Sequence, residues 1–218
     1  NGLLDYVQYN TASAYGSFDP DRTSTYSCKS QAYYMISSLG QTEIRCSAPD
    51  NCTLNDVVTV TTSIGIIRNG YQEGIDYSFK NGKIYVELPD GWEYVNNSTY
   101  KSQYFYQPKK GWATTVTVNP KLIYDFGGTG KRAIVFDVPD DSAPGWWSDF
   151  TFHLKAVSST PKGESPIVSW LSYENNQAAG LSPKYENSAV DIYDLNGNGS
   201  VTDFLAKSST TISFTPTK

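Results

Sequence analysis

The sequence predicts an all-β protein, an antiparallel β-sandwich of Ig-like or jelly-roll-like type with an irregular N-terminal segment. Short runs rich in Tyr, Val, Ile and Thr are separated by turn signals, and no strong amphipathic helix pattern is present. The 218 residues include 17 Tyr, 9 Phe and 5 Trp, but a single His and a single Met. Many short strands at this spacing are typical of a sandwich.

The N-terminal quarter, residues 1–55, shows poor alternation, and within it Lys29–Leu39 fits either a short helix or a strand. From Val57 to Ile67 a long β-branched run predicts a buried strand. In 76–88 we expect a hairpin, with Asn81–Gly82 as its two-residue turn. The second strand of that hairpin alternates, with Ile84, Val86 and Leu88 on one face.

The remaining strands follow the same pattern. In the strand that ends at Val138, Ile134 and Phe136 share its face, and a turn-rich loop follows. The further strands are predicted at 100–106, 114–118, 133–138, 150–154, 167–172 and 211–214.

Around residue 150 the alternation places Phe150, Phe152 and Leu154 toward the core and His153 on the opposite, polar face. The only His of the chain is therefore expected to be a solvent-facing strand residue, not a catalytic base. We expect one domain over 1–218, with a weak boundary at the Ser-, Pro- and Gly-rich stretch 158–166.

The charge balance is mildly acidic, with a formal net charge of -5, a pI of about 4.9 and a mean hydropathy of -0.44. Nucleic acids and anionic membranes favour clusters of Lys and Arg, which the chain lacks. No apolar segment approaches the length of a membrane helix. We therefore expect neither nucleic-acid binding nor membrane insertion.

The three cysteines, Cys28, Cys46 and Cys52, allow at most one internal disulfide. Cys46 and Cys52 flank a turn-like stretch and are the preferred pair, while Cys28 with Cys46 is the alternative. With one His and no C-x-x-C motif, a zinc site is not expected.

A calcium site is suggested near the C-terminus, where oxygen-bearing side chains alternate around glycines. Asp194, Asn196, Asn198 and Asp203, with Asp191 as an alternative to the last, would supply the oxygens. The stretch resembles the first half of an EF-hand or dockerin-type loop, but Leu205 stands at the twelfth position. A plain Gly- and Asn-rich loop is the competing interpretation.

The aromatic residues near turns are the candidates for ligand binding. Flat rings with polar edges stack on sugars and are favoured in binding patches. Core or rim packing is the alternative for any single ring. The candidates are Trp146, Trp147, Trp92, Tyr94 and Trp112.

Catalytic motifs are absent from the sequence, so we expect a protein that is not an enzyme. Asp137, Asp140, Asp141 and Asp149 crowd one region, and a glycosidase would need two carboxylates across a cleft. Their turn-like context favours an ordinary loop.

Two segments, 76–92 and 135–145, resemble Ig-like adhesin modules of Gram-positive cell-wall-anchored surface proteins. The resemblance implies a multi-domain protein at the cell surface or cell wall that binds mucus glycans, matrix proteins or neighbouring cells. Such modules sometimes join a strand Lys to an Asn covalently, and Lys83, Lys121 and Lys155 lie in or beside predicted strands.

We therefore expect a non-enzymatic extracellular adhesin module that recognises host glycans, mucin or matrix proteins. One alternative is a structural spacer or surface-layer unit. The other is a calcium-stabilised carbohydrate-binding or carbohydrate-active domain.

Overall fold

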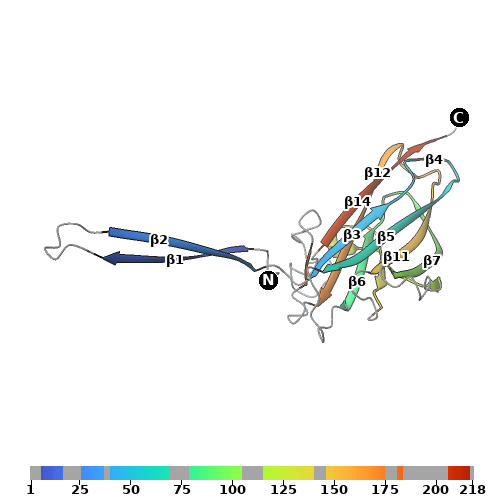
Figure 1. The fold of residues 1–218 in the computed structure, drawn as a ribbon. Coiled ribbons are helices and arrows are strands. Elements are labelled where there is room, and N and C mark those ends of the chain that lie inside the picture. The colour runs from blue at the N-terminus through green and yellow to red at the C-terminus, as the bar shows by residue number, and fades with distance from the viewer. Residues whose placement is uncertain are drawn as a thin grey trace.

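The computed structural model describes residues 6–16, 26–36, 40–68, 79–104, 115–139, 146–174, 181–183 and 206–216. Strands dominate these ranges, with one short 3-10 helix, η1, at Phe126–Gly128. Two six-stranded sheets pack face to face, and a separate two-stranded sheet joins β1 and β2 (Figure 1). The predicted all-β sandwich is therefore confirmed.

Sheet I has the strand order β4-β14-β12-β6-β10-β9, and sheet II the order β13-β3-β5-β11-β7-β8. All pairings are antiparallel except β13 with β3 and β14 with β4, which are parallel. The strands are β1 Tyr6–Gly16, β2 Tyr26–Ile36, β3 Gly40–Ser47, β4 Asn51–Thr53, β5 Val57–Arg68, β6 Lys80–Glu87, β7 Glu93–Tyr104, β8 Val116–Val118, β9 Lys121–Ile123, β10 Ala133–Asp137, β11 Trp146–Lys155, β12 Gly163–Glu174, β13 Leu181–Pro183 and β14 Ala206–Thr215.

The core lies between the two sheets and is formed by the faces that alternation predicted. Phe150, Phe152 and Leu154 of β11 are buried, as are Ile134 and Phe136 of β10. The ring centroids of Phe136 and Phe150 are 5.3 Å apart, so these two sheets meet through aromatic contacts. One hydrophobic cluster contains residues from both sides of the 158–166 stretch, from Ile44 to Phe214.

The expected hairpin at 76–88 is not formed at Asn81–Gly82. Both residues lie within β6, where the register against β12 shifts and Asn81 has a φ of 48°. This pattern is a β-bulge, which uses the same residue types as a turn. Gly82 suits this position because a Cβ there would lie 2.9 Å from Cβ of Val138.

The N-terminal segment, expected to be irregular, contains β1 to β4. Within the open choice at 29–39, residues 29–36 are strand, because β2 runs through Tyr26–Ile36, and residues 37–39 lie outside the described residues. In β3, Thr42 and Ile44 point into the core while Arg45 and Ser47 are exposed. The alternation was hard to recognise because a threonine occupies an inward position of this strand.

Polar side chains hydrogen-bond across the core and connect the two sheets. Oγ1 of Thr62 in β5 lies 2.8 Å from Oγ of Ser169 in β12. Oγ1 of Thr42 in β3 lies 3.1 Å from the phenolic oxygen of Tyr173, also in β12. Since both bonds are buried, each satisfies groups that would otherwise be costly to remove from water.

Tyr173 should make the protein sensitive to alkaline pH. Burial raises the pKa of its phenol from 10.0 to about 12. The folded state therefore retains a proton that the unfolded chain releases, so this contribution is complete below pH 10 and is lost as the pH rises toward 12. Between these values wild type should lose about 2–3 kcal/mol of unfolding free energy that the Tyr173→Phe variant retains.

Urea denaturation of wild type and Tyr173→Phe across this pH range measures that difference. The contributions of other groups that titrate at alkaline pH cancel in this difference, because both proteins contain those groups. Parallel stability curves for the two proteins between pH 10 and 12 would contradict the expected role of Tyr173.

Candidate functional site

The outer face of sheet II, which points away from the core, is the candidate site. Its strands β3, β5, β11 and β7 are in register, so their outward side chains form rows across the sheet. The rows are Glu43–Gly65–Trp147, Arg45–Ser63–Asp149–Lys101 and Ser47–Thr61–Thr151–Thr99.

Trp147 occupies the first row and lies on Gly65 of the neighbouring strand. A Cβ built on Gly65 would lie only 3.1–3.2 Å from ring atoms of Trp147. Because glycine has no side chain, the indole can cross β5 and reach toward β3. Trp147 is half-buried there, with part of the ring still at the surface.

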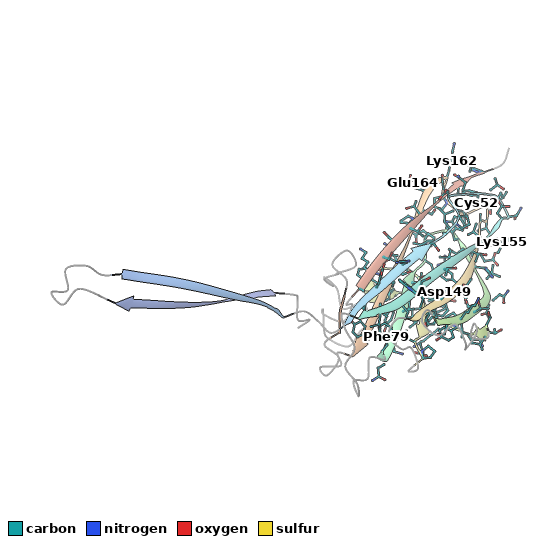
Figure 2. The ribbon with its side chains drawn as sticks, in the orientation of Figure 1. Cys52, Phe79, Asp149, Lys155, Lys162 and Glu164 are labelled. Atoms are coloured by element: carbon teal, nitrogen blue, oxygen red, sulfur yellow. The ribbon has the colours of Figure 1, made fainter. Side chains whose placement is uncertain are left out.

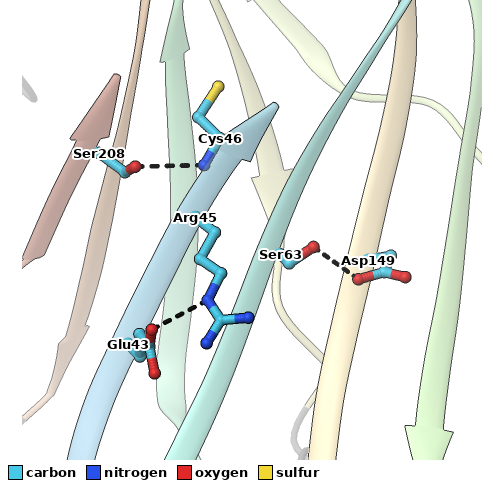
Figure 3. Close-up of polar contacts among 6 residues, drawn as sticks. All are labelled: Glu43, Arg45, Cys46, Ser63, Asp149 and Ser208. Atoms are coloured by element: carbon cyan, nitrogen blue, oxygen red, sulfur yellow. Dashed lines mark hydrogen bonds and ion pairs between the residues drawn. The ribbon is translucent and has the colours of Figure 1, made fainter. Parts of the chain in front are cut away.

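Arg45 completes this group from β3. Its guanidinium carbon lies 4.2 Å from the centroid of the Trp147 ring. Its Nε donates to Oε1 of Glu43 at 2.9 Å, as Figure 3 shows. The Arg45 side chain remains 63% exposed, whereas that of Glu43 is 8% exposed. The stacking and the ion pair together hold the guanidinium in one orientation at the surface.

The rest of the outer face is hydroxyl-rich. Oγ of Ser63 donates to Oδ1 of Asp149 at 2.7 Å, as Figure 3 shows. The hydroxyl oxygens of Thr61 and Thr151 are 3.3 Å apart. The site therefore combines one aromatic ring, one fixed cation and a row of neutral donors and acceptors.

His153 lies next along β11, on this same outer face. Its Nδ1 is 3.4 Å from Oγ1 of Thr59, and the side chain is half-buried. This agrees with the predicted position on the polar face of the strand.

Trp92, expected at a binding surface, lies in the core instead. It is 2% exposed, its Nε1 donates to Oγ of Ser165 at 3.0 Å, and its ring contacts Phe214 edge-on. Nη2 of Arg132 also donates to the backbone oxygen of Trp92 at 2.5 Å. Proximity to the Asp90–Gly91 turn suggested exposure, but the chain directs this ring between the sheets.

The other predicted aromatics have different positions. Tyr94 packs against the core and its hydroxyl lies 2.8 Å from Oγ of Ser98. Trp146 is the first residue of β11, and Trp112 lies outside the described residues. Of the five predicted rings, Trp147 is the one whose described surroundings form a site.

The predicted calcium ligands Asp194, Asn196, Asn198 and Asp203 lie outside the described residues, as does Asp191. Calcium binding there stays a prediction. Among the residues that are described, no three His, Cys, Asp or Glu side chains are placed to hold a metal ion.

The acidic residues that could have formed a hydrolytic pair are separated. Asp137 lies on sheet I and is 85% exposed at its side chain, whereas Asp149 lies on sheet II. Asp140 and Asp141 lie outside the described ranges. Asp137 and Asp149 occupy different sheets, so these two do not face each other across a cleft.

The lysines that were candidates for a covalent link have ordinary surroundings. Nζ of Lys83 lies 2.5 Å from Oδ1 of Asp137, and the Lys83 side chain is 44% exposed. Its hydrogen bond to Asp137 raises the pKa of Lys83. Lys121 is exposed and Lys155 is half-buried near the end of β11 (Figure 2). These positions agree with the solvent-facing alternative.

Cys46 and Cys52, the preferred disulfide pair, are both free thiols. The segment between them leaves sheet II and enters sheet I, so Cys46 pairs with Thr62 of β5 while Cys52 pairs with Phe214 of β14. Burial raises the pKa of both thiols, and so favours their protonated, unreactive form.

Sequence patterns identified Trp147 as a binding residue but not its neighbours. Glu43 and Arg45 lie in the segment that was expected to be irregular, and Gly65 and Ser63 belong to a predicted strand. A useful signal was the alternation of Glu43, Arg45 and Ser47 with Thr42 and Ile44, which assigns the charged residues to one face.

No protein-family model matches this chain, and no curated protein sequence matches it either. Gram-positive surface adhesin and pilin domains are among the solved structures it is similar to. The collagen-binding domain from a Staphylococcus aureus adhesin is 9% identical, with a TM-score of 0.38, over 81% of this chain and 98% of that one. The full-length major pilin SpaD from Corynebacterium diphtheriae is 12% identical, with a TM-score of 0.42, over 63% of this chain and 31% of the pilin.

An enzyme is also similar. AvmM, which catalyses macrocyclization in alchivemycin A biosynthesis, is 9% identical, with a TM-score of 0.37, over 85% of this chain and 94% of the enzyme. Because one fold serves many activities, function has to be inferred from the residues of this chain. Within the described ranges, no helix has the length and hydropathy of a membrane span.

Proposed function

We propose that this chain is a non-enzymatic binding module of an extracellular, cell-surface adhesin, and that it recognises host glycans, mucin or a matrix protein. The outer face of sheet II is the proposed contact surface. The observation that carries the proposal is the stacked group of Arg45 on Trp147 on Gly65, held by Glu43.

Several properties of this group support binding. Trp and Arg are the residue types most often found at energetic centres of interfaces. Arg45 is held in place before a partner arrives, so less side-chain entropy is lost on binding. The outer face of sheet II presents these groups together with the row from Ser47 to Thr99.

Replacing Trp147 with alanine should weaken ligand binding by about thirtyfold or more, because it removes a central aromatic contact and the support of Arg45. The measurement is a screen of the folded protein against glycans, mucin and matrix proteins, with calcium and with chelator. Tyr124→Ala is the matched control, since Tyr124 is 71% exposed and follows β9 of sheet I.

Binding that survives Trp147→Ala and Arg45→Ala unchanged would place the ligand on another surface. The absence of binding to every probe would favour the spacer or surface-layer role. Loss of binding in chelator alone would direct attention to the predicted calcium loop at 194–203.

A further inference from the structure

We infer that Arg45 recognises an acidic group, a carboxylate or a sulfate, on a glycan that lies across the outer face of sheet II. This inference rests on the proposed function and adds the chemical class of the ligand. It follows from how the Arg45 side chain is held and from what surrounds it.

The guanidinium of Arg45 has its nitrogen donors only partly used. Nε donates to Glu43, and the described part of the chain gives the guanidinium no other hydrogen bond. Its central carbon lies over the Trp147 ring, 4.2 Å from the ring centroid. The two terminal nitrogens therefore remain available, and a guanidinium fixed in this way matches the two oxygens of a carboxylate or sulfate.

The carboxylate of Glu43 does not occupy the terminal nitrogens of Arg45, where the acidic group of the ligand would bind. Its side chain is 8% exposed and contacts Arg45 through Nε, while the Arg45 side chain is 63% exposed. The carboxylate thus orients the guanidinium from the side away from solvent. A ligand would meet the cation first.

The second row of the outer face carries two cations and one carboxylate. Arg45, Ser63, Asp149 and Lys101 follow one another across four strands, with the one carboxylate between the two cations. Ser63 donates to Asp149, so this carboxylate already accepts a hydrogen bond. On a protein whose formal net charge is -5, this row provides a local site for an anion.

The neighbouring row favours a glycan over an acidic peptide. Ser47, Thr61, Thr151 and Thr99 present hydroxyl groups across the same four strands. Hydroxyl groups both donate and accept hydrogen bonds, as the hydroxyls of a sugar do. The described outward residues of these two rows include no large aliphatic side chain that would anchor a peptide.

Lactose, sialyllactose and sulfated lactose are suitable probes, because they differ in the terminal acidic group. Wild type should bind at least one acidic probe about tenfold or more tightly than lactose, as expected for a charge-assisted hydrogen bond. Arg45→Ala should abolish this preference, so that the acidic probes bind the variant no more tightly than lactose does. Arg45→Lys should restore only part of it, since an ammonium lacks the planar fork.

The control variant is Lys207→Ala on sheet I. Nζ of Lys207 lies 4.6 Å from the centroid of the Trp170 ring, so the variant removes a similar cation–aromatic pair from the other sheet. Its affinities should match wild type. Calorimetry gives the affinities, and thermal melts verify that each variant is folded.

Preference for sialyllactose alone would assign a carboxylate, preference for sulfated lactose alone would assign a sulfate, and preference for both would assign a general acidic group. Equal affinity for lactose and both acidic probes would overturn the inference and leave the proposed glycan binding intact. If none of the three probes binds while mucin or a matrix protein does, the acidic glycan is excluded but the adhesin function stands.

Discussion

Replacing Trp92 with alanine is expected to lower the free energy of unfolding by about 3–5 kcal/mol. The ring is 2% exposed between the sheets, and its removal would leave a cavity beside Phe214. The variant would also leave the Ser165 hydroxyl without the donor that it now accepts from. Chemical denaturation followed by far-UV circular dichroism measures the loss.

Trp147→Ala is the matched comparison for this prediction. Trp147 is half-buried on the outer face, so its removal should cost about 1 kcal/mol or less of stability while affecting binding. If Trp92→Ala were as stable as wild type but deficient in binding, the prediction would be wrong and Trp92 would be a ligand-binding residue.

Gly91→Ala is expected to destabilise the protein by more than about 3 kcal/mol. Gly91 has a φ of 75°, which disfavours any residue with a Cβ. In addition, a Cβ there would lie 2.2 Å from the backbone oxygen of Ser159. The two segments are held together because Oγ of Ser159 and Oγ1 of Thr160 both donate to the backbone oxygen of Gly91, so this contact cannot easily be relieved.

Gly130→Ala separates the two causes. Gly130 has a φ of 73°, but a Cβ there would meet no atom within 4 Å. This variant should therefore lose only the roughly 1 kcal/mol that a left-handed backbone costs an alanine. Thermal and urea unfolding of both variants measures the difference, and equal losses would show that the contact with Ser159 is unimportant.

The connection between β11 and β12 contains Ser159 and accounts for most of the Ser-, Pro- and Gly-rich stretch 158–166, where a weak domain boundary was expected. It carries the chain from β11 of sheet II to β12 of sheet I at the end of the sandwich where Lys162 and Glu164 lie, away from Phe79 (Figure 2). Its Ser, Pro and Gly content is what a tight connection against the Gly91 turn requires.

Local patterns along the chain were enough to predict the class of fold and which residues share a face in its clearest strands. Alternation groups Ile84 and Phe136 each on one face of a strand and places Phe152 toward the core, because a strand directs successive side chains to opposite faces. All three side chains are buried. That rule is local, so it needs no knowledge of which strands are neighbours.

Contacts between strands far apart in the chain determine which polar and aromatic residues meet. Asn81–Gly82 has the composition of a turn, but pairing with β12 and β10 makes it a bulge within β6. Trp92 and Trp147 were both expected at the surface. Trp92 instead fills the core, where its ring contacts Phe214. Arg45, Gly65 and Trp147 meet only because β3, β5 and β11 are neighbours in register, and strand order depends on contacts between segments far apart in the chain.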